Sequence, residues 1–271
     1  MKRSLYAPAT LTFLALVLSG CSNGGASGSG TTGSTGGSTS PSVSPLPATG
    51  ATPTAVPTLP PYSVNINPAD FTNVVTNPYF KLTPGSTRTY TGTKDGVPLQ
   101  ATFKVLTQAK TIIGVKCVVV QDTVTLNGSL EEKTLDWFAQ DSKGNVWYFG
   151  EDSKDYKNGV VVSTTGTWLS GVNGGQPGIV MLAAPTVGAP YVEEYLPGVA
   201  EDHAQVVKSG VSITVPTGSY KNVIITKNTN PLDPSLLEHK FYAPGVGMVY
   251  ETKHYGGSHM EIMRLVRVTG L

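Results

Sequence analysis

The sequence predicts a mainly β protein: a single domain built from one curled antiparallel meander sheet, similar to half of a barrel, with few short helices. Three observations predict it. Strand-like runs recur about every ten to fifteen residues, tight-turn dipeptides separate them, and no stretch keeps a long helical period. Gly and Pro account for 31 and 20 of the 271 residues, which indicates many turns together with an unfolded segment.

Residues 1–20 have the features of a signal peptide. Lys2 and Arg3 supply its positive charge, and residues 11–18 form an apolar run that is too short to span a bilayer as a helix. The Leu-Ser-Gly-Cys sequence at residues 18–21 resembles the lipobox of bacterial lipoproteins. The resemblance implies cleavage before Cys21, a lipid on its sulfur, and acylation, with palmitate as the expected chain, of the new amino terminus.

A lipidated Cys21 predicts anchoring in the cell membrane or the outer membrane, with the chain facing the periplasm or the cell exterior, because several acyl chains together anchor stably. Residues 21–62 then form a tether. From Ser22 to Tyr62 the chain has 8 Gly, 8 Ser, 8 Thr and 7 Pro and no charged residue. This composition buries too little apolar surface to fold, so we expect a disordered spacer before a β-rich globular domain at residues 63–271.

The globular part is a succession of predicted strands and turns. Asn127-Gly128 is the strongest two-residue hairpin signal in the chain. A short helix is expected at residues 68–75 or 233–237. The predicted strands cover residues 87–93, 99–106, 115–126, 130–140, 145–150, 160–167, 191–196, 204–208, 212–215, 223–227, 238–243, 247–255 and 261–268.

The alternation of polar and apolar residues indicates a sheet that curls around something. Residues 118–120 are three valines and look buried on both faces, whereas both faces of residues 130–140 mix apolar and charged side chains. We expect a sheet of this kind to wrap around its own loops or around a ligand. Cys117 adjoins the three valines, so we expect a buried and unreactive thiol.

Several segments carry a family resemblance. Residues 136–152 read Asp-Trp-Phe-Ala-Gln-Asp-Ser-Lys-Gly-Asn-Val-Trp-Tyr-Phe-Gly-Glu-Asp, and further matching segments lie at residues 174–181, at 191–195 with 201–202, and at 241–247. Together they resemble an uncharacterised family of secreted bacterial proteins and lipoproteins, over residues 77–251. The resemblance implies no activity. The last segment is also similar to lipoprotein-carrier half-barrels, which implies an open sheet around an apolar groove.

Aromatic residues are dense around the central hairpin. Trp147 and Phe149 point to one face of their strand and Tyr148 to the other. These side chains either fill the core or line a groove for an apolar or glycan ligand. The candidate groove residues are Trp137, Trp147, Phe149 and Trp168.

Carboxylates and histidines form a second candidate site. Oxygen ligands suit a hard cation, three histidines suit zinc, and paired carboxylates suit acid–base hydrolysis. Residues 141–145 fail the EF-hand pattern at Lys143, and turn-forming Asp or solvated strand ends explain the acidic residues equally well. We therefore expect no cofactor and no metal. The residues that would serve a metal are Asp136, Glu194, Asp202 and His239.

The sequence favours a membrane-anchored lipoprotein with a non-catalytic β-rich domain over an enzyme. A net charge of +1 excludes a strongly basic nucleic-acid-binding protein. No nucleophile elbow, phosphate loop or CxxC motif occurs in the folded part. Two alternatives remain: a metal- or carboxylate-dependent hydrolase acting on envelope material, and a structural envelope protein held by protein partners.

Overall fold

Turns with left-handed backbone join the long strands into one sheet. The computed structural model describes residues 62–271, so the expected signal peptide, Cys21 and nearly all of the expected tether lie outside the described residues. Asn127 and Gly128 both have positive φ angles, 48° and 79°, as a two-residue hairpin loop requires. The predicted hairpin at this position is confirmed.

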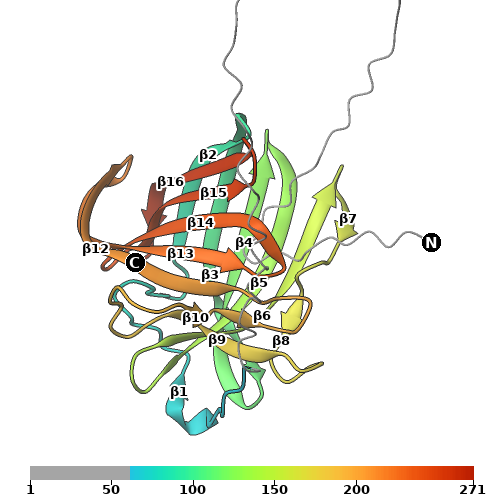
Figure 1. Cartoon of the computed structure of the whole chain (residues 1–271), viewed down its shortest axis with the longest axis vertical. Helices are drawn as coiled ribbons and strands as arrows, with labels where there is room; N and C mark the ends of the chain where they lie inside the picture. The colour runs from blue at the N-terminus through green and yellow to red at the C-terminus, as the bar shows by residue number, and fades with distance from the viewer. Residues whose placement is uncertain (1–61) are drawn as a thin grey trace, which may run out of the picture. The chain divides into compact units, whose positions relative to one another are not determined.

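The described residues form a single antiparallel sheet of 16 strands. Figure 1 shows this sheet nearly closed into a barrel. This confirms the predicted curled antiparallel sheet. Its order is β10-β12-β13-β14-β15-β16-β2-β3-β4-β5-β6-β9-β11, with β1 beside β5 and with β7 and β8 beside β6. The strands are β1 (Phe71–Thr72), β2 (Thr87–Lys94), β3 (Val97–Ile112), β4 (Val115–Leu126), β5 (Ser129–Asp141), β6 (Val146–Lys157), β7 (Val160–Ser163), β8 (Trp168–Leu169), β9 (Gln176–Met181), β10 (Tyr191–Val192), β11 (Glu194–Tyr195), β12 (His203–Val215), β13 (Gly218–Asn230), β14 (Asp233–Ala243), β15 (Gly247–Tyr255) and β16 (Met260–Thr269).

Helical structure in the described residues is limited to one 3-10 turn, η1 (Pro68–Asp70). The expected helix at residues 68–75 stops early because Phe71 and Thr72 pair with β5. The alternative helix at 233–237 is wrong, since β14 begins at Asp233 and joins the ladder with its neighbours. Nothing in the described part of the chain is a helix long and apolar enough to cross a membrane.

Several strand predictions differ from the structure; the strand expected at residues 160–167, for example, ends at Ser163. The strands expected at residues 204–208 and 212–215 are one strand, β12, whose register against β13 shifts three times. β9 was not predicted, because its flanking Gly and Pro residues read as a loop. Gly178 within β9 permits a close approach: a Cβ there would lie 2.4 Å from the Glu193 carbonyl oxygen.

The barrel closes through one short segment, residues 191–195, which we call the seam. Its first part, β10, pairs with β12, and its last part, β11, pairs with β9. The amide of Glu193 between them donates to the Asp202 carbonyl at 2.7 Å. The two edges of the sheet are therefore joined by a few hydrogen bonds to one stretch of chain.

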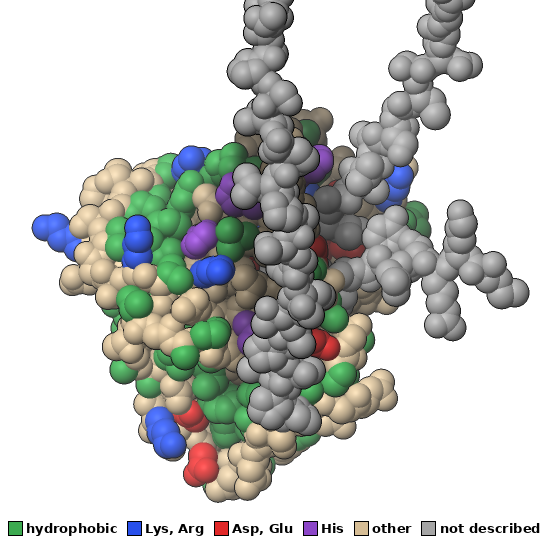
Figure 2. Space-filling view, viewed as in Figure 1, with side chains coloured by type: hydrophobic (Ala, Val, Ile, Leu, Met, Phe, Trp, Pro, Cys, Tyr) green, Lys and Arg blue, Asp and Glu red, His purple; other side chains and the backbone are tan. Residues whose placement is uncertain are grey.

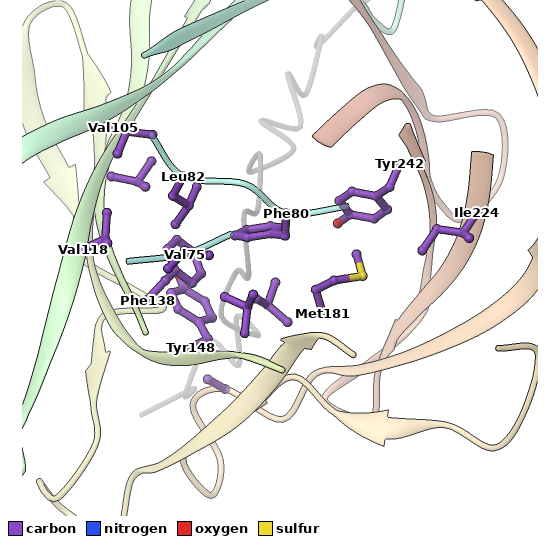
Figure 3. Close-up of a cluster of buried hydrophobic side chains, with 14 of the residues drawn as sticks. Val75, Phe80, Leu82, Val105, Val118, Phe138, Tyr148, Met181, Ile224 and Tyr242 are labelled. Carbon is purple, nitrogen blue, oxygen red and sulfur yellow. The ribbon is translucent and has the colours of Figure 1, made fainter. Parts of the chain in front are cut away.

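The space inside the sheet, the lumen, is entered by residues 75–82, which we call the plug. The plug lies outside the strand ladder and has one isolated bridge, between Val75 and Leu82. Figure 3 shows Phe80 and Leu82 between the two walls of the sheet, with Tyr242 on one side and Val105 on the other. These side chains belong to the largest buried hydrophobic cluster among the described residues. The sheet is thus wrapped around its own preceding segment.

Candidate functional site

Besides the hydrophobic cluster around the plug, the interior of the sheet contains many charged side chains. Among the described residues, ten carboxylates and four basic side chains are less than a tenth exposed. An uncompensated buried charge is costly, so each needs a partner or, for an acid, a proton. On the face in Figure 2, charged side chains are scattered among hydrophobic and other types. The buried charged residues are Arg88, Lys94, Asp122, Glu132, Asp136, Glu151, Glu193, Glu194, Asp202, Glu238, Lys240, Glu251, Lys253 and Glu261.

Sheet register arranges four of these residues as a row of alternating charge. Glu238 on β14 lies opposite Lys253 on β15. Lys253 in turn lies opposite Glu261 on β16, which lies opposite Lys94 on β2. Opposite charges on neighbouring strands stabilise a sheet, and here they also offset burial. Acidic and basic residues far apart in the sequence are thereby placed next to one another.

Lys240 joins this row through Glu238. The Lys240 Nζ lies 3.1 Å from Glu238 Oε2, and both side chains are almost completely buried. Burial lowers the pKa of Lys240, but the nearby Glu238 and Glu193 outweigh it and raise this pKa well above its usual value. Lys240 is therefore a fixed positive charge that Glu238 offsets.

Tyr148 links two carboxyl groups in the lumen. Its hydroxyl lies 2.5 Å from Asp136 Oδ1 and 3.2 Å from Glu151 Oε2. Burial raises the pKa of Asp136 to about 7; burial and the nearby Asp136 raise that of Glu151 well above its usual value. A phenol has one proton, so it donates to one carboxylate and accepts from the other only when that group is protonated. The geometry fits a chain in which Glu151 donates to Tyr148 and Tyr148 donates to Asp136.

Three further carboxyl groups surround the seam. Burial raises the pKa of Glu193, and burial with the nearby Glu151 and Asp202 raises that of Glu194 well above its usual value. Ionising Glu194 together with its acidic neighbours would place like charges across the join, so the closed seam favours the protonated form of Glu194. Each accepts a hydrogen bond from a neutral side chain: Glu194 from Trp168 Nε1 (2.9 Å), Glu193 from Asn228 Nδ2 (2.5 Å) and Asp202 from Asn230 Nδ2 (3.0 Å).

A cavity of about 40 Å³ lies between the plug and the sheet. That volume holds about three water molecules, at roughly 10–15 Å³ each, and is smaller than the roughly 150 Å³ of an apolar cavity that binds benzene. Most of the wall is apolar. Its hydrophobic residues include Phe80, Leu82, Ala101, Phe103, Met248 and Met263, and its charged residues are Lys81, Arg88, Asp122, Lys240 and Glu251.

Burial favours the protonated forms of both acidic residues in the cavity wall. Burial and the nearby Asp136 raise the pKa of Asp122 to about 8. Burial and the nearby Glu238 raise the pKa of Glu251 well above its usual value. Because Lys240 is paired with Glu238, these groups together add little net charge to the cavity.

Arg88 is the exception in this wall. Its Nε donates to the Val246 carbonyl and its Nη2 to the Lys81 carbonyl, both at 2.6 Å, while its buried Nη1 has no hydrogen-bond partner. The Phe103 ring lies 5.6 Å from the guanidinium carbon. Within residues 62–271 no carboxylate forms an ion pair with Arg88. Burial lowers the pKa of Arg88, yet an arginine stays protonated in proteins, so the cavity has one buried cation without a counter-charge.

The four candidate groove residues lie in two places. Trp137, Trp147 and Phe149 form a cluster with Phe71, whose ring is edge-on to Phe149 at 5.5 Å. Trp168 belongs to the cluster around the plug. None of the four lines the cavity. Trp147 and Phe149 share one cluster and Tyr148 lies in the other, so the predicted division of these rings between two faces is confirmed.

The four candidate metal residues are also divided. Asp136, Glu194 and Asp202 are buried in the interior, whereas His239 is on the opposite face of β14 from its buried neighbours Glu238 and Lys240. Within residues 62–271 no group of three or more His, Cys, Asp or Glu side chains is placed to hold a metal ion. Solvation is the wrong explanation for these three carboxylates, because all three are buried.

Two other expectations are confirmed. Asp141 forms a turn, since its Oδ1 accepts hydrogen bonds from the amides of Lys143 and Asn145. Cys117 is fully buried, and burial raises the pKa of its thiol to about 12, which leaves it protonated and unreactive.

Sequence reasoning missed Arg88, Lys240 and Glu251, although a signal existed for Arg88. Residues 87–94 read Thr-Arg-Thr-Tyr-Thr-Gly-Thr-Lys, with Thr at every odd position. Threonines suit the outer face of such a strand, so the alternate face with Arg88 must be the inner one. Lys240 and Glu251 gave no comparable signal, because their meaning depends on cross-strand register.

The fold and interior define a class: a nearly closed antiparallel β-barrel domain with a partly polar lumen. No family model and no curated protein matches the chain. Among solved structures, the chain is similar to a Bacteroides fragilis NCTC 9343 protein described as exported and having a YmcC-like fold. The two sequences are 14% identical, the TM-score is 0.42, and the match covers 71% of this chain and 99% of the other. The chain is also similar to a Parabacteroides distasonis ATCC 8503 protein described as a lipoprotein, with 12% identity and a TM-score of 0.38, and this match covers 70% of this chain and 98% of the other. Similarity this distant carries no functional argument, so the proposals below depend on this chain's own residues.

Proposed function

We propose that this chain is a lipid-anchored protein of the bacterial envelope whose β domain binds a small, mainly apolar ligand in the lumen. The observation that carries the binding function is the cavity between the plug and the sheet, with its apolar wall and the buried cation Arg88, which has no counter-charge among the described residues. Most ligand pockets combine apolar walls with a few polar groups that orient the ligand.

The plug provides the route by which the cavity enlarges. Phe80 and Leu82 form part of its wall, and the segment that carries them is held outside the strand ladder. When these two side chains move aside, the ligand occupies their space and the sheet itself stays intact. The ligand is therefore small, on the scale of one ring or a short chain, because the cavity and the space of these two side chains are small together.

The anchor is supported by the lipobox at residues 18–21, followed by an uncharged segment rich in Gly, Ser, Thr and Pro. Cys21→Ala is expected to move the protein from the membrane fraction to the soluble fraction or leave the precursor uncleaved. Cys117→Ala serves as the control and should leave fractionation unchanged, because this thiol is buried. An unchanged membrane fraction for Cys21→Ala would refute the anchor.

Ligand binding is tested with 2-phenylethanol, added to the full chain carrying Cys21→Ala and followed by calorimetry. The wild-type cavity should bind it, and Ala101→Leu should abolish binding, because the larger side chain fills the cavity from its wall. Val97→Leu, on the same strand but 38% exposed, should leave binding unchanged. No binding of 2-phenylethanol, or equal binding to Ala101→Leu, would contradict the proposal.

A further inference from the structure

The guanidinium of Arg88 has a hydrogen-bonding capacity that the protein leaves partly unused. Arg88 is 2% exposed, and its Nη1 has no partner. A buried cation without a counter-charge is costly, and a hydrogen bond to a charged group is worth more than one between neutral groups. The site therefore favours an anion.

The bond between Nη2 and the Lys81 carbonyl depends on the plug. Lys81 belongs to the plug, so displacement of this segment frees Nη2. The bond from Nε to the Val246 carbonyl does not involve the plug and keeps the guanidinium in place. Nη1 and Nη2 then form one edge with two parallel donors, which matches the two oxygens of a carboxylate.

The shape of the remaining space matches an aromatic ring. The Phe80 ring packs edge-on against Phe138 at 5.2 Å and against Phe103 at 6.3 Å. A ligand ring that replaces Phe80 would keep these favourable edge-to-face contacts. The Arg88 guanidinium also lies beside Phe103, so the cation and the ring site adjoin one another.

We propose that the ligand of the lumen is a small aromatic carboxylic acid. Its ring takes the place of the Phe80 ring, and its carboxylate binds the Nη1–Nη2 edge of Arg88 in place of the Lys81 carbonyl. This inference rests on the proposed function, whose cavity it uses, and it adds the chemical class of the ligand.

Phenylacetate and phenylacetamide test the inference, because they share a ring and a shape but differ in charge. Their affinities for the full chain carrying Cys21→Ala are compared by calorimetry at neutral pH. The acid should bind at least tenfold more tightly than the amide. Arg88→Gln should remove this preference, whereas Arg264→Gln should retain it, because Arg264 is exposed and lies over the Tyr250 ring at 5.3 Å.

The outcomes separate this inference from the proposed function. The inference is overturned if the acid and the amide bind with equal affinity, or if Arg88→Gln still prefers the acid. In either case the proposed function stands as long as 2-phenylethanol binds. Failure of both compounds and of 2-phenylethanol overturns both proposals. Near-UV circular dichroism checks that Arg88→Gln is folded. If Arg88→Gln does not fold, Arg88→Lys is used instead, because it keeps the positive charge but lacks the edge with two parallel donors. Arg88→Lys should bind phenylacetate more tightly than phenylacetamide by a smaller factor than the wild type does. An unchanged factor would contradict the bidentate contact.

Discussion

Asp136 on β5 lies directly opposite Glu151 on β6, and the Tyr148 hydroxyl contacts both carboxyl groups. Two carboxylates at such a position repel one another when both are ionised, so the pair keeps a proton that each group would lose in water. The same reasoning applies to most of the interior formed by residues 62–271, which has ten buried carboxyl groups and four buried basic side chains. Protons are therefore part of what holds the lumen together.

The first prediction concerns the pH dependence of stability. The pKa is raised to about 8 for Asp122 and Glu132, and to about 7 for Asp136 and Glu261, in each case mainly by burial. Unfolded carboxyl groups titrate near pH 4, so these groups bind protons more tightly in the folded state. Their contribution to stability is complete below about pH 4 and is lost as the pH rises towards 8. Urea unfolding should show the free energy of unfolding falling by several kcal/mol between pH 5 and pH 8; a flat or rising profile would contradict this interpretation.

Asp136→Asn isolates one of these groups. The amide oxygen still accepts the hydrogen bond from Tyr148, but the side chain no longer ionises. The variant should match the wild type at pH 5 and be more stable at pH 8 by about 2–3 kcal/mol, because the wild type loses about 1.4 kcal/mol per pH unit from this group between pH 5 and its pKa of about 7. Asp152→Asn is the matched control: its side chain is 38% exposed and paired with Lys154, so a change below about 1 kcal/mol is expected. A loss of stability in Asp136→Asn at pH 8 would show that this group is ionised and stabilising there.

Phe80→Ala tests the role of the plug. Removing this buried ring should cost about 3–5 kcal/mol of unfolding free energy, because it leaves a cavity beside Phe138 and Phe103. Benzene should restore part of the loss and raise the melting temperature of the variant more than that of the wild type. Val74→Ala, at a side chain that is 63% exposed close to the plug, should change stability by less than about 0.5 kcal/mol. Equal effects of the two substitutions would show that Phe80 does not fill the lumen in solution.

Gly178→Ala tests the seam. A Cβ at Gly178 would lie 2.4 Å from the Glu193 carbonyl oxygen, so β9 and the seam must separate. Hydrogen exchange should become faster at residues 191–195, and stability should fall by about 2 kcal/mol or more. Gly188→Ala is the control, because a Cβ there meets its nearest atom at an ordinary 3.6 Å. Unchanged exchange at the seam in Gly178→Ala would mean that the barrel closes elsewhere.

Much of the sheet could be predicted from local signals. The strands at residues 115–126 and 247–255 have the predicted bounds, because hairpin turns and β-branched runs mark their ends. Closure was harder to predict, because β9 and the seam contain Gly and Pro and depend on a contact between Gly178 and Glu193.

The candidate site was less predictable than the fold. The dense aromatic residues near the central hairpin predicted the ligand groove there. The cavity is lined instead by residues that include Phe80, Arg88 and Lys240. The plug comes from a segment that reads as a loop, and a loop that turns inward has no periodicity. The burial of the charged residues could not be predicted, because it depends on cross-strand pairs such as Glu238 with Lys253. No local sequence pattern encodes this register.

The pairing of β16 with β2 has a consequence for how the domain is made. Thr87 at the start of β2 lies opposite Thr269 at the end of β16. One edge of β2, the first long strand, can therefore be paired only after the last strand has been made, whereas its other edge pairs with β3. Contacts between such distant residues are slow to form because a long loop of chain must be closed first. Until β16 has been added, one edge of β2 stays unpaired, and an exposed strand edge of this kind can pair with other chains.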